Sequence, residues 1–173
     1  MSTSIWNQSK TGGRNHLAAI KQGLVDAHII LMCSGHLKFG GIKAIANELK
    51  KAVDRGARVT FYSNDKHTEQ EAADALTKLG VEQIVVDHSR SYLHAKLYYF
   101  EAGDRYSAIA GSANITKAAL LSNEELSFVA NGTKGDSHHQ QLAAYMAHLD
   151  RKCRRRQAPK IDQNGNPIPL VYR

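Results

Sequence analysis

The chain has 173 residues, the size of one ordinary domain that can bury a core without disulfides or a structural metal. Its two cysteines, Cys33 and Cys153, are too few and too far apart for a disulfide framework or a cysteine-rich zinc site, so we expect free thiols. The formal net charge of +7 favours a polyanionic partner such as nucleic acid. No apolar run approaches the roughly 20 residues of a membrane span, and the N-terminus lacks the apolar core of a signal peptide. We therefore expect a cytoplasmic protein that does not associate with membranes.

Helices and strands are expected to alternate along the first half of the chain. Hydrophobic periodicity and glycine stop signals predict, in chain order, a helix at 14–26, a strand at 28–33, a helix at 42–55, a strand at 57–63, a helix at 68–79 and a strand at 81–87. Such alternation with short links is typical of a parallel sheet covered by helices.

The second half of the chain changes its pattern. Two strand-like runs, 93–101 and 105–112, are separated by Ala-Gly-Asp, which predicts a hairpin. A further strand is predicted at 125–131 and a final helix at 136–152. The predicted fold class is α/β, with a mixed, largely parallel sheet flanked by helices on both faces and one domain over residues 1–156. Residues 157–173 hold all three prolines and predict an extended or disordered tail.

Chemistry-bearing residues concentrate on the predicted hairpin. His94 and Lys96 are two apart, so on a strand both side chains project from the same face. The hairpin returns Ser112 and Asn114 beside them, because antiparallel neighbours lie about 5 Å apart. An imidazole, an ammonium group, a hydroxyl and an amide then converge. Lysine and asparagine can donate to phosphate oxygens while a neutral histidine attacks phosphorus.

These segments, HAKLYYFE and GSANIT with KAALLSNEELSFV downstream, resemble the H-x-K and G-S-x-N signature of the phospholipase D superfamily. The similarity runs from about residue 28 to 131, and its specific part is 93–129. The chain departs from the family pattern at Glu101, where an aspartate normally stands five positions after the lysine. Its hairpin is also a few residues longer than in the most compact members. We expect the glutamate to leave the chemistry intact, whereas both departures leave room for a catalytically silent member.

The resemblance implies a role for each matching residue. His94 attacks phosphorus and forms a covalent phosphohistidine, while Lys96 and Asn114 hold the nonbridging oxygens. Ser112 hydrogen-bonds the site or the phosphate. Glu125 accepts from a ring N–H of His94 and so fixes its tautomer. No metal and no cofactor is implied.

The resemblance also implies a homodimer. Family members use two such motifs per active site, because a second histidine protonates the leaving group. This chain carries one motif, and similar single-motif members form twofold dimers with a shared cleft. We therefore predict isologous contacts around the site.

Three further residues are candidates for substrate binding. Gly111 would permit close approach of the backbone to phosphate. His36 and Lys38 follow the first predicted strand, at the edge where open α/β sheets bind ligands. A plain surface histidine is the alternative for His36. A basic cluster precedes the tail and is formed by Arg151, Lys152, Arg154, Arg155 and Arg156.

The function predicted from these patterns is a metal-independent phosphodiesterase, an endonuclease that hydrolyses DNA or RNA through a phosphohistidine. The resemblance implies a nuclease, because in this superfamily a short single-motif architecture goes with nucleases, and the basic charge favours the same reading. A catalytically silent nucleic-acid-binding member of the same fold is one alternative. A phospholipase is another, although no membrane-binding amphipathic stretch is evident. The choice between DNA and RNA stays open.

Overall fold

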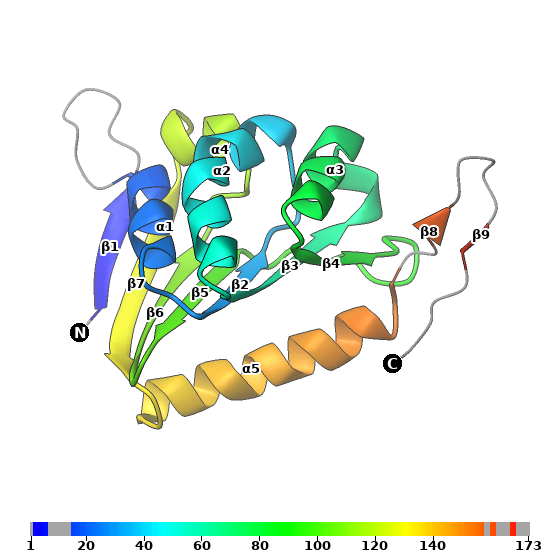
Figure 1. The fold of residues 1–173 in the computed structure, drawn as a ribbon. Helices are drawn as coiled ribbons and strands as arrows, with labels where there is room; N and C mark the ends of the chain where they lie inside the picture. Colours follow the sequence, from blue (N-terminus) through cyan, green and yellow to red (C-terminus); the bar gives the residue numbers. More distant parts are fainter. Residues whose placement is uncertain (1, 7–14, 158–159, 162–166, 169–173) are drawn as a thin grey trace.

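A seven-stranded mixed sheet runs through the molecule in the order β1-β7-β6-β5-β2-β3-β4. The computed structural model describes residues 2–6, 15–157, 160–161 and 167–168 (Figure 1). The strands of this sheet are β1 (Ser2–Trp6), β2 (Ile29–Cys33), β3 (Arg58–Asn64), β4 (Glu82–Val86), β5 (Leu97–Ala102), β6 (Arg105–Gly111) and β7 (Leu126–Thr133).

Helices cover both faces of the sheet. One face carries α1 (His16–Leu24), α2 (Phe39–Asp54), α3 (Gln70–Lys78) and α4 (Lys117–Leu121), and the other face carries the long helix α5 (Ser137–Arg154) (Figure 1). A short 3-10 helix, η1 (Asp65–His67), follows β3. The predicted α/β class with helices on both faces is confirmed.

The parallel part of the sheet is smaller than predicted. Strand β3 pairs in parallel with β2 and with β4. Strand β5 joins the other edge of β2 antiparallel, and β6, β7 and β1 continue antiparallel from there. The helix–strand alternation of the first half extends only to β4, so the hairpin determines the direction of the remaining strands.

The core has two layers because the central strands bury both faces. On β2, Ile30 and Met32 pack toward the helices α1 and α2, while Leu31 and Cys33 pack on the α5 side. Strands buried on both faces read as continuous apolar runs, which explains why HIILMC was recognisable from sequence. Cys33 and Cys153 are both buried and free, as predicted.

The predicted tail is described only in part. Gln157 forms a bridge with Val86, and β8 (Lys160–Ile161) pairs antiparallel with β9 (Pro167–Ile168). The rest of the predicted tail lies outside the described residues. In the described part of the chain, no helix is long and apolar enough to cross a membrane.

Candidate active site

His94 and Lys96 do not lie on a strand, contrary to the prediction of a strand at 93–101. Strand β5 begins at Leu97, and residues 91–96 have no regular secondary structure. Leu97 pairs with Cys33, the last residue of β2. Because β2 ends at Cys33, it has no residue left to pair with the chain before Leu97. Residues 91–96 therefore do not continue the strand.

A buried asparagine holds this segment in place. Asn64, the last residue of β3, is fully buried; its Nδ2 donates to the Leu93 carbonyl at 2.6 Å, and its Oδ1 accepts from the Leu93 N–H at 2.9 Å. The same Nδ2 also donates to the Gly35 carbonyl at 3.2 Å. Leu93 points inward, so its neighbours Tyr92 and His94 face solvent. Sequence reasoning missed Asn64, although a polar residue closing a buried parallel strand is a usable signal.

The side chains of His94 and Lys96 meet despite the missing strand. The Lys96 Nζ lies 3.2 Å from the His94 Nε2 and donates to the His94 carbonyl at 2.8 Å. An ammonium group can only donate, so this contact places the lone pair of a neutral imidazole on Nε2. Burial lowers the pKa of Lys96, and the negative charge of Glu125 partly offsets that shift.

Ser112 and Glu125 form a second pair at the junction of β6 and β7. The Ser112 hydroxyl donates to the Glu125 carboxylate and accepts from the Leu126 N–H at 3.1 Å. Asn123 donates weakly to the other carboxylate oxygen at 3.5 Å. Among the described residues Glu125 makes no hydrogen bond to His94, so the predicted orienting contact is not formed within the chain.

Two buried residues, His16 on α1 and Ser127 on β7, lie next to this pair. The Nε2 of His16, a fully buried residue of α1, lies 2.9 Å from the Ser127 hydroxyl. Burial lowers the pKa of His16, and the charge of Glu125 opposes the shift. A Cβ at Gly111 would clash with the Ser127 hydroxyl and the Leu126 carbonyl. The glycine is thus required by the approach of β7, and its predicted approach to phosphate stays a prediction.

Asn114 is fixed by its oxygen. Its Oδ1 accepts from the His36 N–H at 3.0 Å and lies 3.4 Å from the hydroxyl of the buried Ser34. That hydroxyl in turn accepts from the Ile115 N–H at 2.9 Å. With the oxygen engaged inward, the Asn114 amide nitrogen is the donor left for a phosphate oxygen. No local pattern in the sequence indicates this role of Ser34.

The two residues predicted after β2 have different surroundings. The His36 ring stacks on the ring of His67, with centroids 4.2 Å apart. Burial lowers the pKa of His36, and the neighbouring charges of His67 and Lys96 lower it further. The His36 N–H also donates to Asn114, which ties this residue to the motif. The Lys38 ammonium instead pairs with Glu69 at 3.4 Å. The structure thus brings His36 to the site, while Lys38 is engaged in an ion pair.

Glu101 lies away from these residues. Its buried carboxylate accepts from the Lys134 ammonium at 2.6 Å and from the Tyr99 hydroxyl at 3.0 Å. Burial alone would raise the pKa of Glu101, but these hydrogen bonds hold it below its ordinary value. The Glu101 carboxylate is thus engaged by contacts within the fold.

A cluster of side chains that could bind a metal ion lies apart from the residues of the H-x-K and G-S-x-N motifs. Among the described residues, the only three carboxylate, histidine or cysteine side chains close enough to share an ion are those of Asp65, Asp87 and His88. Their atoms are already engaged, since His88 Nδ1 lies 2.8 Å from Asp65 and Asp87 accepts from Ser89.

Comparisons with known proteins bear on the family and the fold of the chain. The family model described as "Cardiolipin synthase, PLD-like domain" matches residues 21–149. The fold is similar to the phospholipase D family member Nuc from Salmonella typhimurium, with a TM-score of 0.69 and 16% identity over 91% of this chain and 97% of that one. NucT from Helicobacter pylori gives a TM-score of 0.67 and 16% identity over 88% and 97%. A yeast tyrosyl-DNA phosphodiesterase variant gives 0.52 and 11% over 79% and 33%. None of the curated proteins compared matches the sequence.

Replacing Asn64 by alanine should loosen the segment that carries His94. The Leu93 N–H and carbonyl would lose their partners, and a buried unsatisfied group costs about 1–3 kcal/mol. We expect a lower free energy of unfolding in urea and faster hydrogen exchange at the Leu93 amide. Asn47→Ala, at an exposed position of α2, is the matched control and should change stability by about 0.5 kcal/mol or less. Wild-type stability and exchange in Asn64→Ala would contradict the anchoring role.

Proposed function

The chain belongs to the family of phospholipase D-like domains, and on that premise we propose that it is a metal-independent phosphodiesterase that hydrolyses nucleic acid. The observation that carries this proposal is the pair formed by His94 and Lys96. A neutral imidazole with its lone pair on Nε2 lies beside a cation that can neutralise phosphate oxygens. The net charge of +7 and the fold likeness to a DNA phosphodiesterase support nucleic acid as the substrate.

In the proposed reaction, His94 Nε2 attacks phosphorus, a P–N bond forms and the P–O bond to the leaving nucleoside breaks. A second histidine gives its proton to the leaving oxygen. Water then attacks the phosphohistidine and gives a proton to the second histidine, the P–N bond breaks and the imidazole is released. Lys96 and the amide nitrogen of Asn114 stabilise the charge on the nonbridging oxygens in both steps.

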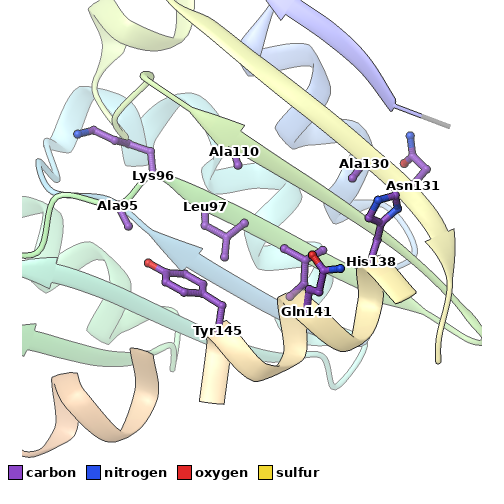
Figure 2. A pocket seen from close by; sticks show the side chains of 10 residues that line it. Ala95, Lys96, Leu97, Ala110, Ala130, Asn131, His138, Gln141 and Tyr145 are labelled. Atoms are coloured by element: carbon purple, nitrogen blue, oxygen red, sulfur yellow. The ribbon is translucent and has the colours of Figure 1, made fainter. Parts of the chain in front are cut away.

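The second histidine is proposed to be His94 of another copy of the chain. A patch of exposed apolar side chains lies next to the site on β7, where Leu126 is 51% exposed and Phe128 62%. Alternation along the strand places both on the same face as Ala130, which lines a groove of about 710 Å³ between α5 and the sheet. Figure 2 shows that this groove extends along the sheet from Lys96 toward His138. Exposed apolar area that reaches a catalytic residue fits a shared twofold interface.

The same dimer gives Glu125 its proposed role. Within one protomer its carboxylate is engaged by Ser112 and not by His94. We propose that Glu125 orients a His94 imidazole only in the assembled dimer, where the two half-sites meet. Ser112 then holds the carboxylate in position for that contact.

Cleavage of DNA or RNA oligonucleotides should persist in EDTA and should disappear in His94→Ala. Loss of the nucleophile is expected to lower kcat by a factor of about 10⁴ or more. His88→Ala, a histidine that contacts Asp65 away from the site, is the control and should keep the wild-type rate. Oligonucleotide binding without cleavage would favour a silent binding protein. Headgroup release from phosphatidylcholine vesicles would favour a phospholipase.

If two subunits share one active site, an inactive subunit should also abolish the activity of the wild-type subunit with which it pairs. When wild-type protein exchanges subunits with excess His94→Ala, activity should fall more steeply than dilution predicts, because mixed dimers lack one histidine. Light scattering should give twice the chain mass, and Phe128→Glu should yield inactive monomers. A fully active monomer would exclude the shared site.

On bis(p-nitrophenyl) phosphate, a diester whose leaving group needs no general acid, the activity should fall with rising pH as Lys96 loses its proton. Since burial lowers the pKa of Lys96, this alkaline limb should lie below the ordinary lysine value of about 10.4. Lys96→Arg should lower the maximal rate but remove the limb, because a guanidinium group stays charged. Lys43→Arg, exposed on α2, should leave the profile unchanged. If the alkaline limb persists in Lys96→Arg, another group causes it and its assignment to Lys96 is wrong.

A further inference from the structure

Four aromatic rings follow one another across the surface and end at the proposed nucleophile. The His36 and His67 rings stack with centroids 4.2 Å apart, and the His67 and Tyr92 rings are nearly perpendicular, with centroids 5.8 Å apart. Tyr92 in turn stacks on His94, with centroids 5.9 Å apart and ring planes inclined by 26°. The catalytic motif accounts only for the last ring.

Tyr92 is presented to solvent by a rigid backbone. It is 48% exposed, and its hydroxyl makes no hydrogen bond to any residue that the structure describes. The adjacent Leu93 is held by Asn64 through both of its backbone groups. The carbonyl of His67 also accepts from the Leu37 N–H at 3.0 Å. The neighbouring backbone therefore positions the Tyr92 ring. Its hydroxyl contributes no described hydrogen bond to the stability of the fold.

A hollow opens beside the Tyr92 ring. It has a volume of about 140 Å³ and lies between the segment that carries His94 and helix α5. Its α5 wall includes His148 and Lys152. In the described part of the chain Lys152 forms no salt bridge, whereas the nearby Arg154 is paired with Asp150 and Glu82. An exposed ring and an available ammonium group thus border the same hollow.

We propose that Tyr92 and Lys152 form a subsite for the nucleotide next to the scissile phosphate, in which an unpaired base stacks on Tyr92 and the neighbouring phosphate contacts Lys152. This inference rests on the proposed nuclease function and names its substrate class as single-stranded nucleic acid. Bases in a duplex are stacked on one another, so only an unpaired base can offer its face to an exposed ring. The His67 ring, inclined by 83° to Tyr92, fixes the orientation of the platform.

The test compares an oligonucleotide with bis(p-nitrophenyl) phosphate, a small diester that has no flanking nucleotide. The quantity measured is the ratio of kcat/KM for a single-stranded oligonucleotide to kcat/KM for the small diester. Tyr92→Ala should lower this ratio roughly 5- to 100-fold, the usual effect of losing one base–aromatic stack. Tyr92→Phe keeps the ring and should stay within about twofold of the wild type, whereas Tyr92→Leu should resemble the alanine variant.

Lys152→Ala tests the phosphate contact in the same assay. It should lower the ratio and reduce the salt dependence of oligonucleotide binding by roughly one phosphate contact. Lys51→Ala, an exposed lysine on α2 at the opposite face of the sheet, is the matched control and should change neither quantity. The wild type should also prefer single strands to the corresponding duplex.

Failure of the subsite and failure of the nuclease function give different results. Equal losses on both substrates in Tyr92→Ala, or no loss on either, would overturn the subsite while leaving the nuclease intact. If the wild type cleaves neither substrate, the nuclease proposal fails. In that case fluorescence anisotropy with a labelled single-stranded oligonucleotide tests the subsite separately. The subsite requires that Tyr92→Ala bind this oligonucleotide more weakly than Tyr92→Phe does.

Discussion

The amide of Asn64 makes the hydrogen bonds on which the site depends. Buried backbone N–H and carbonyl groups must find partners, yet the ladder between β2 and β5 stops where β2 ends. Asn64 supplies both partners for Leu93 and one for Gly35. One side chain at the end of β3 thus joins the loop that leads to His36 with the segment that carries His94.

This junction explains why the site lies where it does. It is found at the carboxyl ends of β2 and β3, beside the strand at which the sheet changes from parallel to antiparallel pairing. Chains leaving the sheet there diverge and open space for a ligand, as in other α/β folds. A second network, in which Asn114 accepts from the His36 N–H beside Ser34, fixes the donor on the opposite side. Because the Asn114 oxygen is held within the fold, its amide nitrogen needs little rearrangement to donate to a phosphate oxygen.

The sequence was sufficient to identify the residues of the motif but not the residues that hold them in position. Spacing placed His94 and Lys96 together, and they do meet, yet through a loop and the reach of a long side chain instead of a shared strand face. Asn64 acts on a residue 29 positions away and Ser34 on one 80 positions away. Local periodicity carries no information about such pairs.

The fold was predictable where burial leaves a pattern. Apolar runs and amphipathic spacing located the strands and helices of the first half, as well as the hairpin and α5. The strand β1 (Ser2–Trp6), with serine and threonine at three of its five positions, and the five-residue helix α4 carry no such pattern. The direction of β5 depends on its pairing with β2, which lies more than sixty positions earlier in the chain, and so the parallel share was overestimated.

The contact between Lys96 and His94 also has a consequence for the proposed reaction. The Lys96 ammonium covers the Nε2 lone pair that is to attack phosphorus. A phosphodiester is an anion, and its oxygens form stronger, charge-assisted hydrogen bonds to an ammonium group than a neutral ring nitrogen does. A substrate that enters the site therefore draws Lys96 toward the nonbridging oxygens and exposes Nε2 in the same movement. Charge neutralisation and release of the nucleophile are in this way coupled through one side chain.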